Sequence, residues 1–200
     1  MSEPGRSRCG WVPDNDALYQ AYHDDEWGVP VHDDRALFEA LVLDGAQAGL
    51  TWRSILVRRP DYRRAFHNFE IDRVARLTAD DEARLVLDAG IIRNRAKIRS
   101  AVQNARAALI VTQESGSLDR FLWSFVGGAP RVNRWSDSRD IPADSEESKA
   151  MSRELRRRRF TFVGPVICYA FMQAVGMVMD HTTSCFRYRD LTSASGVSHA

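Results

Sequence analysis

The sequence predicts an all-α fold. Apolar residues recur at helical spacing, capping residues precede several of these segments, and no convincing period-two alternation marks a half-buried strand. The chain has 200 residues, of which 44% are hydrophobic and 28% are charged. It is therefore long enough to bury a core, and its composition is that of an ordinary globular protein.

The predicted helices begin after capping residues and end at glycine or proline. In chain order we expect a helix from Asp33 or Asp34 to about Gly49, a short helix over 51–59 that stops before Pro60, and a turn or two over 61–66. A helix over 80–88 follows, opened by a capping box of Thr78 and Asp81. A long helix then runs from Asn94 to about Gly116. Then follow a helix over 118–126 capped by Ser117, a long loop over 127–144, a helix from Ser145 through the arginines at 156–159, and an apolar helix from Pro165 to about Gly176. Residues 188–200 are expected to form a disordered tail.

Net charge is only +1, but the basic residues are clustered. One interpretation is that these are solvated helix faces. Three clusters in a balanced chain favour a polyanionic partner instead. The clusters are Arg58, Arg59, Arg63 and Arg64; Arg93, Arg95, Lys97 and Arg99; and Arg156 to Arg159.

No apolar run approaches the length of a membrane span, and the first residues lack the apolar segment of a signal peptide. We therefore expect no membrane partner, a cytoplasmic location and, by default, a monomer.

Two of the three cysteines stand near opposite ends of the chain. Cys168 lies in the apolar run VICYAFM and is expected in the core. His181 and Cys185 are four residues apart, on one face of a helix, and Cys9 and His23 are the partners that would complete a site. Two thiolates and two imidazoles fit one tetrahedral, structural zinc ion with no open position. The alternatives are ordinary histidines with free thiols, or His32 as a rival ligand.

The segment 84–98, RLVLDAGIIRNRAKI, predicts helix, turn and helix. Gly90 is expected in a left-handed conformation where the first helix ends, and Asn94 caps the second. The free amides there, with Arg95 and Lys97 alongside, suit a phosphate oxygen. This is the helix–hairpin–helix pattern, which grips the DNA backbone; the alternative is a common turn between two helices.

Asp44 falls on the apolar stripe of its predicted helix, three residues after Leu41 and four before Ala48. A buried carboxylate must pair, meet a polar ligand or line a cavity, unless the helix is rotated and Asp44 is solvated. Beyond Gly49, the apolar tip of Leu50 suits a wedge in a base stack. A slot with one carboxylate and aromatic walls would suit a cationic purine. The candidate wall residues are Trp11, Tyr19, Tyr22, Trp27 and Trp52.

The segments RCGW, AYHDDEWGVP, DGAQAGLTW, DAGIIRNRAKI, FLWSFV and FVGPVICYAFMQAVGMVMDH, with Cys185, together resemble the DNA-3-methyladenine glycosylase I family. The resemblance runs from about Arg8 to Cys185. It implies one unit over 8–187, with a helix–hairpin–helix lobe at about 35–115 and a zinc-binding lobe formed by both termini, at 8–34 and 116–187.

The resemblance also implies roles for the candidate residues. Cys9, His23, His181 and Cys185 match the zinc ligands, and Tyr22 matches a tyrosine that hydrogen-bonds the excised base. Trp11 and Trp52 match aromatics of the base pocket, with Tyr19 and Trp27 close by. Gly49 and Leu50 match the loop that fills the gap left in the duplex. Asp44 stands where the family usually has a glutamate that contacts the base.

The implied activity is excision of 3-methyladenine, with 3-methylguanine as a further candidate, from alkylated double-stranded DNA. No lysine stands in the pocket region to form a Schiff base, so we expect hydrolysis without strand cleavage. Asp44, shorter than glutamate, and Ala46, smaller than the residue often found there, would affect the range of substrates. The alternatives are a helix–hairpin–helix protein that only binds DNA and a zinc hydrolase.

Overall fold

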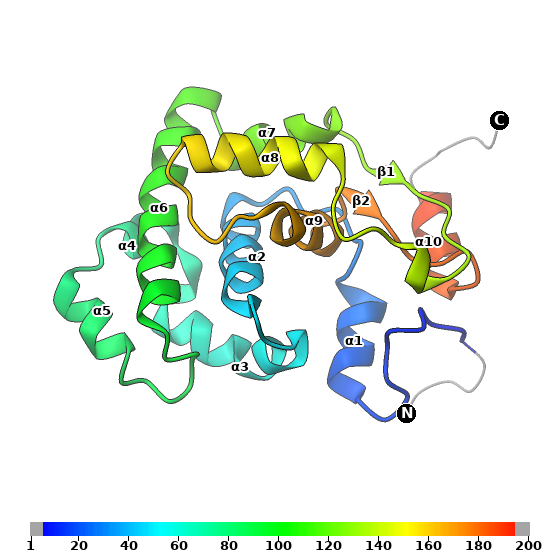
Figure 1. Cartoon of the computed structure of the whole chain (residues 1–200), viewed down its shortest axis with the longest axis horizontal. Coiled ribbons are helices and arrows are strands. Elements are labelled where there is room, and N and C mark those ends of the chain that lie inside the picture. Colours follow the sequence, from blue (N-terminus) through cyan, green and yellow to red (C-terminus); the bar gives the residue numbers. More distant parts are fainter. Residues whose placement is uncertain (1–5, 195–200) are drawn as a thin grey trace.

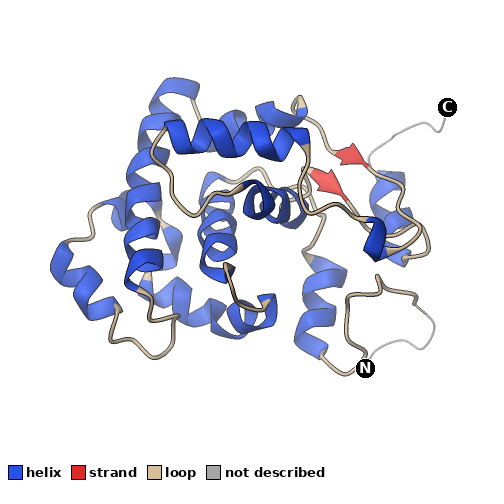
Figure 2. Ribbon diagram, viewed as in Figure 1, coloured by secondary structure: helices blue, strands red, loops and turns tan. Residues whose placement is uncertain are grey.

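The computed structural model describes residues 6–194, and within them the fold is helical, as predicted (Figures 1 and 2). The helices are α1 (Ala17–Asp25), α2 (Asp34–Gln47), α3 (Trp52–Ala65), α4 (Ile71–Ala75), α5 (Ala79–Leu85), α6 (Arg95–Ser115), α7 (Leu118–Trp123), α8 (Glu146–Arg157), α9 (Pro165–Ala174) and α10 (Phe186–Ala194). Short 3₁₀ turns are η1 (His67–Phe69), η2 (Ser124–Val126) and η3 (Ser138–Asp140), and the strands are β1 (Arg131–Val132) and β2 (Val178–Met179).

Helix α2 is the central element. It packs against α3, α6, α7 and α9, and most of its residues are buried (Figure 1). Its apolar residues lie on more than one face, and a helix of this kind is stable when neighbouring elements cover those faces. Asp33 caps it, since its carboxylate accepts a hydrogen bond from the Ala36 amide at 2.8 Å.

The predicted capping residues are confirmed. Thr78 and Asp81 form a reciprocal capping box at α5, and Asn94 accepts from the Lys97 amide at the start of α6. Ser117 and Ser145 cap α7 and α8 in the same way. Side-chain caps are local features, so the sequence alone locates them well.

The predicted stop before Pro60 is wrong. Helix α3 continues through Pro60 to Ala65. A proline inside a helix removes one backbone hydrogen bond and costs about 3 kcal/mol. Leu56 and Tyr62, on either side of Pro60, are both buried, and this packing holds the two halves as one helix.

The long loop contains a strand that the sequence pattern does not reveal. β1 pairs in parallel with β2, with Arg131 opposite Val178 and Val132 opposite Met179 (Figure 2). Two residues are too few to produce a visible alternation. The pairing holds the loop over 127–144 against the segment that leads to His181.

The prediction of a disordered tail from 188 is wrong for residues 188–194, which belong to α10; residues 195–200 lie outside the described part of the chain. Tyr188 and Thr192 are buried, and the Phe186 amide donates to the Ser7 carbonyl at 2.9 Å. The two ends of the described chain therefore lie side by side (Figure 1). This tertiary packing, rather than a strong local pattern, forms the helix.

Among residues 6–194, no helix has both the length and the apolar character that crossing a bilayer would require.

Candidate active site

A slot of about 310 Å³ opens between α1, α2, α3 and α9. All six residues predicted to contact a base line it, namely Trp11, Tyr19, Tyr22, Trp27, Asp44 and Trp52. They come from four separate segments, and the fold brings them together. Five further lining residues are not predicted from the sequence: Gln47, Ser138, Ile141, Ala170 and Gln173.

The aromatic walls are built from edge-to-face contacts. The Trp11 ring lies 5.5 Å from Tyr19 at 72° and 5.0 Å from Trp27 at 74°, between ring centroids. Tyr22 and Trp52 are tilted at 52°, with centroids 5.3 Å apart. Such pairs are favourable in themselves and fix the rings, so the walls are arranged before any ligand enters.

Asp44 lies in the slot with its side chain enclosed by the protein; the residue is only 4% exposed. Its Oδ2 has no hydrogen-bond partner among the described residues. Burial therefore raises the pKa of this carboxyl well above its ordinary value. The alternative of a rotated helix with a solvated Asp44 is wrong.

Unsatisfied polar atoms converge on the slot. Within residues 6–194, four buried side-chain polar atoms lack a partner, and three of them belong to slot residues: Asp44 Oδ2, Trp52 Nε1 and Ser138 Oγ. Buried polar groups are nearly always hydrogen-bonded in folded proteins. An acceptor, a donor and a hydroxyl left free around one cavity indicate that a polar ligand completes the site.

Tyr22 supplies another polar group. Burial, and then the nearby Asp44 carboxylate, raise the pKa of Tyr22 well above its ordinary value. The phenol therefore stays protonated and able to donate a hydrogen bond.

A second cavity of about 280 Å³ lies beside the slot and shares Tyr22, Asp44 and Trp52 with it. Its remaining charged groups are largely paired. Arg59 Nη2 bonds Glu26 Oε1 at 2.7 Å, and Arg63 Nε bonds Glu39 Oε1 at 2.8 Å. The lining residues with an unsatisfied buried polar atom are Asp44 and Trp52, and both also line the slot.

Ala46 does not line the slot. It is buried in the core and packs near α6, beside Lys97, Ile98 and Ala101. Ala46 therefore has no direct contact with a base in the slot, because two residues along a helix turn a side chain by about 200°, away from Asp44.

The basic clusters differ in how far they are neutralised. The α3 arginines mostly pair with acids, and Arg157 and Arg158 bond Glu154, each at 2.7 Å. Arg93, Arg95 and Arg99 are exposed and form no ion pair with any described residue. Arg156 and Arg159 are likewise exposed and form no ion pair with a described residue, so unneutralised positive charge lies both at the turn before α6 and at the end of α8.

Gly90 is not in the left-handed region, contrary to the expectation. Its role is close approach: a Cβ there would lie 2.7 Å from Asp61 Cγ and 2.8 Å from Asp61 Cβ. The turn between α5 and α6 thus packs directly on α3, and only glycine fits.

The Lys97 side chain forms hydrogen bonds with the C-terminal end of α2. Its Nζ donates to the Ala46 carbonyl at 2.7 Å and to the Ala48 carbonyl at 2.6 Å. The last carbonyls of a helix have no partner within the helix, and an ammonium satisfies them well. This side chain is thus directed to α2 instead of standing free beside the α6 amides, and burial lowers its pKa.

Gly49 and Leu50 form the turn that follows. Gly49 has φ +77°, which favours glycine, and Leu50 is 41% exposed. An apolar side chain therefore projects from a turn that lies directly between Asp44 and Trp52 in the sequence. Lys97 anchors the base of the same turn.

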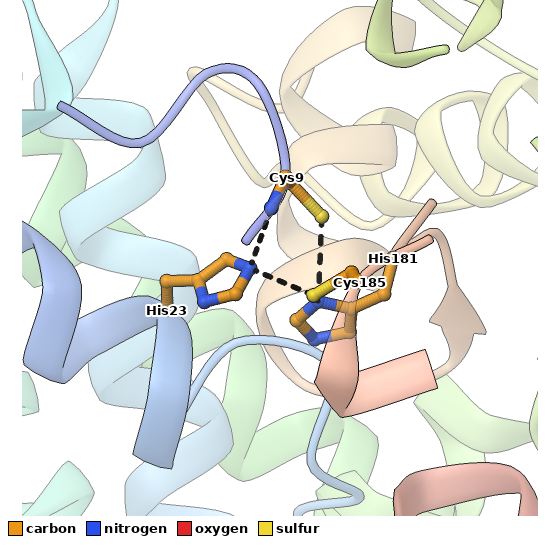
Figure 3. Close-up of side chains that lie close together, drawn as sticks. All are labelled: Cys9, His23, His181 and Cys185. Carbon is orange, nitrogen blue, oxygen red and sulfur yellow. Dashed lines mark hydrogen bonds between the residues drawn. The ribbon is translucent and has the colours of Figure 1, made fainter. Parts of the chain in front are cut away.

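The four predicted metal ligands form a compact buried group. Cys9, His23, His181 and Cys185 point toward one another (Figure 3), and their ligand atoms all lie within 4.8 Å of one another. Both sulfurs lie 3.5 Å from His181 Nδ1, and Cys185 Sγ lies 3.5 Å from His23 Nε2. Zinc bonds of about 2.3 Å to sulfur and 2.0–2.1 Å to nitrogen place tetrahedral ligands at about this separation. The group therefore fits a metal ion.

The second nitrogen of each imidazole is also held. His23 Nδ1 lies 2.7 Å from Asp24 Oδ1, and the Arg8 guanidinium binds that carboxylate. His181 Nε2 lies 2.9 Å from the Trp27 carbonyl. Such partners orient imidazole ligands in metal sites. The rival His32 instead bonds Asp119 at 2.8 Å, outside the group. Because Trp27 lines the slot, the metal group and the slot share a wall.

Considered together, a helical fold, an aromatic slot with a buried acid, an apolar turn at Leu50 and exposed arginines at the turn before α6 are the features of a DNA glycosylase, an enzyme that excises a base flipped out of the DNA duplex. The chain belongs to the methyladenine glycosylase family, whose sequence model matches residues 11–188.

Individual relatives agree. The chain is 48% identical over 181 residues to DNA-3-methyladenine glycosylase 1 of Escherichia coli K12, covering 90% of this chain and 96% of that protein. It is similar to a crystal structure of a 3-methyladenine DNA glycosylase I, with a TM-score of 0.88, 47% identity, and 90% and 98% of the two chains covered. A variant of such an enzyme in complex with 3-methyladenine has a TM-score of 0.84 at 35% identity, with 86% of this chain and 92% of that one covered.

Proposed function

We propose that this chain hydrolyses the N-glycosidic bond of 3-methyladenine in alkylated double-stranded DNA and leaves an abasic site without strand cleavage. The observation that carries the proposal is Asp44, a buried acid without a partner in a slot with aromatic walls. A positively charged flat base supplies both interactions that the slot lacks, namely a countercharge and a ring to stack.

Methylation at N3 makes adenine cationic and weakens the bond between C1′ and the base, so no strong general acid is needed. The base would stack among Trp11, Tyr22 and Trp52, with Asp44 ionised and accepting a hydrogen bond. Water attacks C1′, the bonding electrons return to the ring, and neutral 3-methyladenine leaves as the water loses a proton. Neutral adenine offers Asp44 no countercharge, so burial would keep the acid protonated and binding weak.

The reach of Asp44 sets the position of the base. Aspartate is one methylene shorter than glutamate, so a base that contacts it must sit deeper, toward the α2 backbone. Activity on 3-methylguanine depends on that position and is part of the proposal only as a second, weaker substrate.

Duplex binding would use the turn before α6. Free amides at the start of α6, with exposed Arg95 beside them, suit one phosphate oxygen, and Gly90 lets this turn pack closely on α3. Leu50, carried by Gly49, would fill the space left by the flipped nucleotide. Lys97 would hold the Gly49–Leu50 turn in place instead of contacting the phosphate.

The metal is proposed to be zinc, one ion per chain, with Cys9, His23, His181 and Cys185 as ligands. All four positions of a tetrahedral ion are then protein ligands, and all four residues are buried. The ion would tie the ends of the chain together and hold Trp27 through His181. This coordination leaves no place for an activated water and argues against a zinc hydrolase. Cytoplasmic location and the monomeric state stay predictions.

The experiment is to incubate methylated duplex DNA with the protein and to measure free bases and strand nicks separately. We expect release of 3-methyladenine without nicks; no lysine is among the residues that line the slot in the described chain. A chain that bound DNA without releasing base, even at stoichiometric protein, would refute the proposal. Asp14→Asn, an exposed acid outside the slot, is the matched control for Asp44→Asn.

A further inference from the structure

Asp180 is a completely buried acid that bonds four side chains next to the slot. Its Oδ1 accepts from Asn133 Nδ2 at 2.7 Å and Trp135 Nε1 at 2.8 Å. Its Oδ2 accepts from the Tyr169 hydroxyl at 2.7 Å and Gln173 Nε2 at 2.8 Å. Both oxygens are thus filled by donors, and neither can donate in return.

This arrangement determines how the Gln173 amide is oriented. An amide has one donor end and one acceptor end, and either can usually be exchanged by a flip. Here a flip would place the Gln173 oxygen against Asp180 Oδ2, an acceptor, so the nitrogen must face Asp180. Gln173 lines the slot and Asp180 does not. The side-chain oxygen is therefore left for the slot, and it accepts no hydrogen bond from any residue in the described range.

We propose, on the basis of the proposed function, that Gln173 determines base specificity by presenting a fixed acceptor to the exocyclic amino group of a flipped 6-aminopurine. Asp44 can change from acid to carboxylate, but Gln173 cannot exchange its acceptor for a donor without losing Asp180. A 6-oxopurine would place a carbonyl oxygen against this acceptor. The slot therefore favours 3-methyladenine over 3-methylguanine.

The physical basis is the mismatch between two acceptors. Gln173 is partly buried, and a carbonyl oxygen placed against its amide oxygen forgoes the hydrogen bond that an amino group makes there, so the site disfavours a 6-oxopurine. Trp52 Nε1 and the Tyr22 hydroxyl are donors in the same slot, and Asp44 is a full acceptor only when it is ionised, so Gln173 is the acceptor whose polarity does not change with protonation.

The test is the ratio of kcat/KM for 3-methyladenine to that for 3-methylguanine, measured on one sample of methylated duplex. Gln173→Met keeps the length of the side chain and removes the acceptor, and should lower this ratio by about tenfold, the size of one hydrogen bond. Gln103→Met is the control, because Gln103 also donates a hydrogen bond from its side-chain amide, here to the Arg159 carbonyl, but lies outside the slot. Its ratio should equal that of the wild type.

A loss of stability alone would lower both rates together and leave the ratio unchanged, and that result would overturn the assignment of Gln173 while leaving the proposed function intact. Failure of the wild type to release either base would instead refute the proposed function. If Gln173→Met does not fold, the unaltered protein is titrated with free 3-methyladenine and free 3-methylhypoxanthine by tryptophan fluorescence. We expect tighter binding of the amino compound, and equal affinities would contradict the inference.

Discussion

At the scale of single residues, the Asp44 carboxylate is expected to stabilise a bound ligand but lowers the folding stability of the ligand-free protein. Its pKa lies well above 3.8 because burial disfavours the carboxylate and no donor compensates. Between about pH 4 and this raised pKa, the folded state holds a proton that the unfolded chain has released. The free energy of unfolding therefore falls as pH rises through this range.

The fall in the free energy of unfolding with rising pH leads to a prediction about stability. Asp44→Asn has no charge to bury, so its melting temperature should exceed that of the wild type by about 2–4 °C at pH 8, the shift expected for about 1 kcal/mol in a protein of this size. The difference should disappear near pH 4, where the wild-type acid is protonated in both states. Thermal unfolding followed by circular dichroism at the two pH values measures it. A less stable Asn variant at pH 8 would mean that the carboxylate has a partner in the folded protein.

The sequence predicts residues of this kind when they break a pattern. Asp44 is recognisable because an acid interrupts an apolar stripe, and the five aromatics because they stand in polar surroundings. Gln173 and Ser138 give no such signal: one lies in an apolar helix where a glutamine is unremarkable, and the other in a long loop. Their importance depends on Asp180 and on the path of that loop, which are tertiary features.

At the scale of elements, Lys97 joins the start of α6 to the end of α2. The two carbonyl contacts support the turn that carries Leu50, while Arg95, on the same helix, is exposed. The two cations therefore have different expected roles in DNA binding, even though they are only two residues apart.

Salt dependence separates these roles. Arg95→Met should lower the slope of log K against log salt for duplex binding by about 0.9, the loss of one phosphate contact. Lys97→Met should leave this slope unchanged and weaken binding to a duplex with an abasic site more than binding to an intact duplex, because the Leu50 turn is no longer anchored. Fluorescence anisotropy at several salt concentrations measures both. A slope that changed equally in the two variants would assign Lys97 to the phosphate.

Elements were predictable where their signals are local. Asn94, Ser117, Ser145 and the Thr78 capping box were all located from sequence. Pro60, by contrast, ordinarily indicates the end of a helix, and the burial of residues on both sides of it overrides this signal. The β1–β2 pair and α10 exist only through contacts with distant parts of the chain.

At the scale of the whole molecule, the buried Cys and His side chains connect the two ends of the chain, since Cys9 and His181 are 172 positions apart in sequence. A metal ion held here would stabilise the fold directly, because the unfolded chain does not hold the four ligands together. It would also support Trp27 through the contact between His181 Nε2 and the Trp27 carbonyl.

Removal of one ligand tests this. Cys185→Ala should lose the metal and melt well below the wild type, by about 5 °C or more, since even a few kcal/mol of metal binding exceeds the usual effect of one substitution. Cys168→Ala, a buried cysteine outside the cluster, is the control and should keep one metal ion per chain. Elemental analysis and thermal unfolding measure the two effects. Unchanged metal content in Cys185→Ala would exclude that residue as a ligand.

The global fold class was predictable because helical patterns and caps extend along the whole chain. The division into lobes at 35–115 and at 8–34 with 116–187 stays a prediction. The metal group could be proposed from two spaced pairs, but spacing alone does not distinguish ligands from ordinary histidines. Only the convergence of four side chains from three separate segments does so.

We propose that Asp44 acts on the base rather than on the duplex. The most direct test is a single-turnover excision rate for 3-methyladenine in wild type and Asp44→Asn, with duplex affinity measured on the same samples. We expect the rate to fall by about 100-fold or more, on the order of 3 kcal/mol in transition-state stabilisation, while affinity for the duplex changes by less than about twofold. Equal losses of rate and affinity, or an unchanged rate, would contradict it.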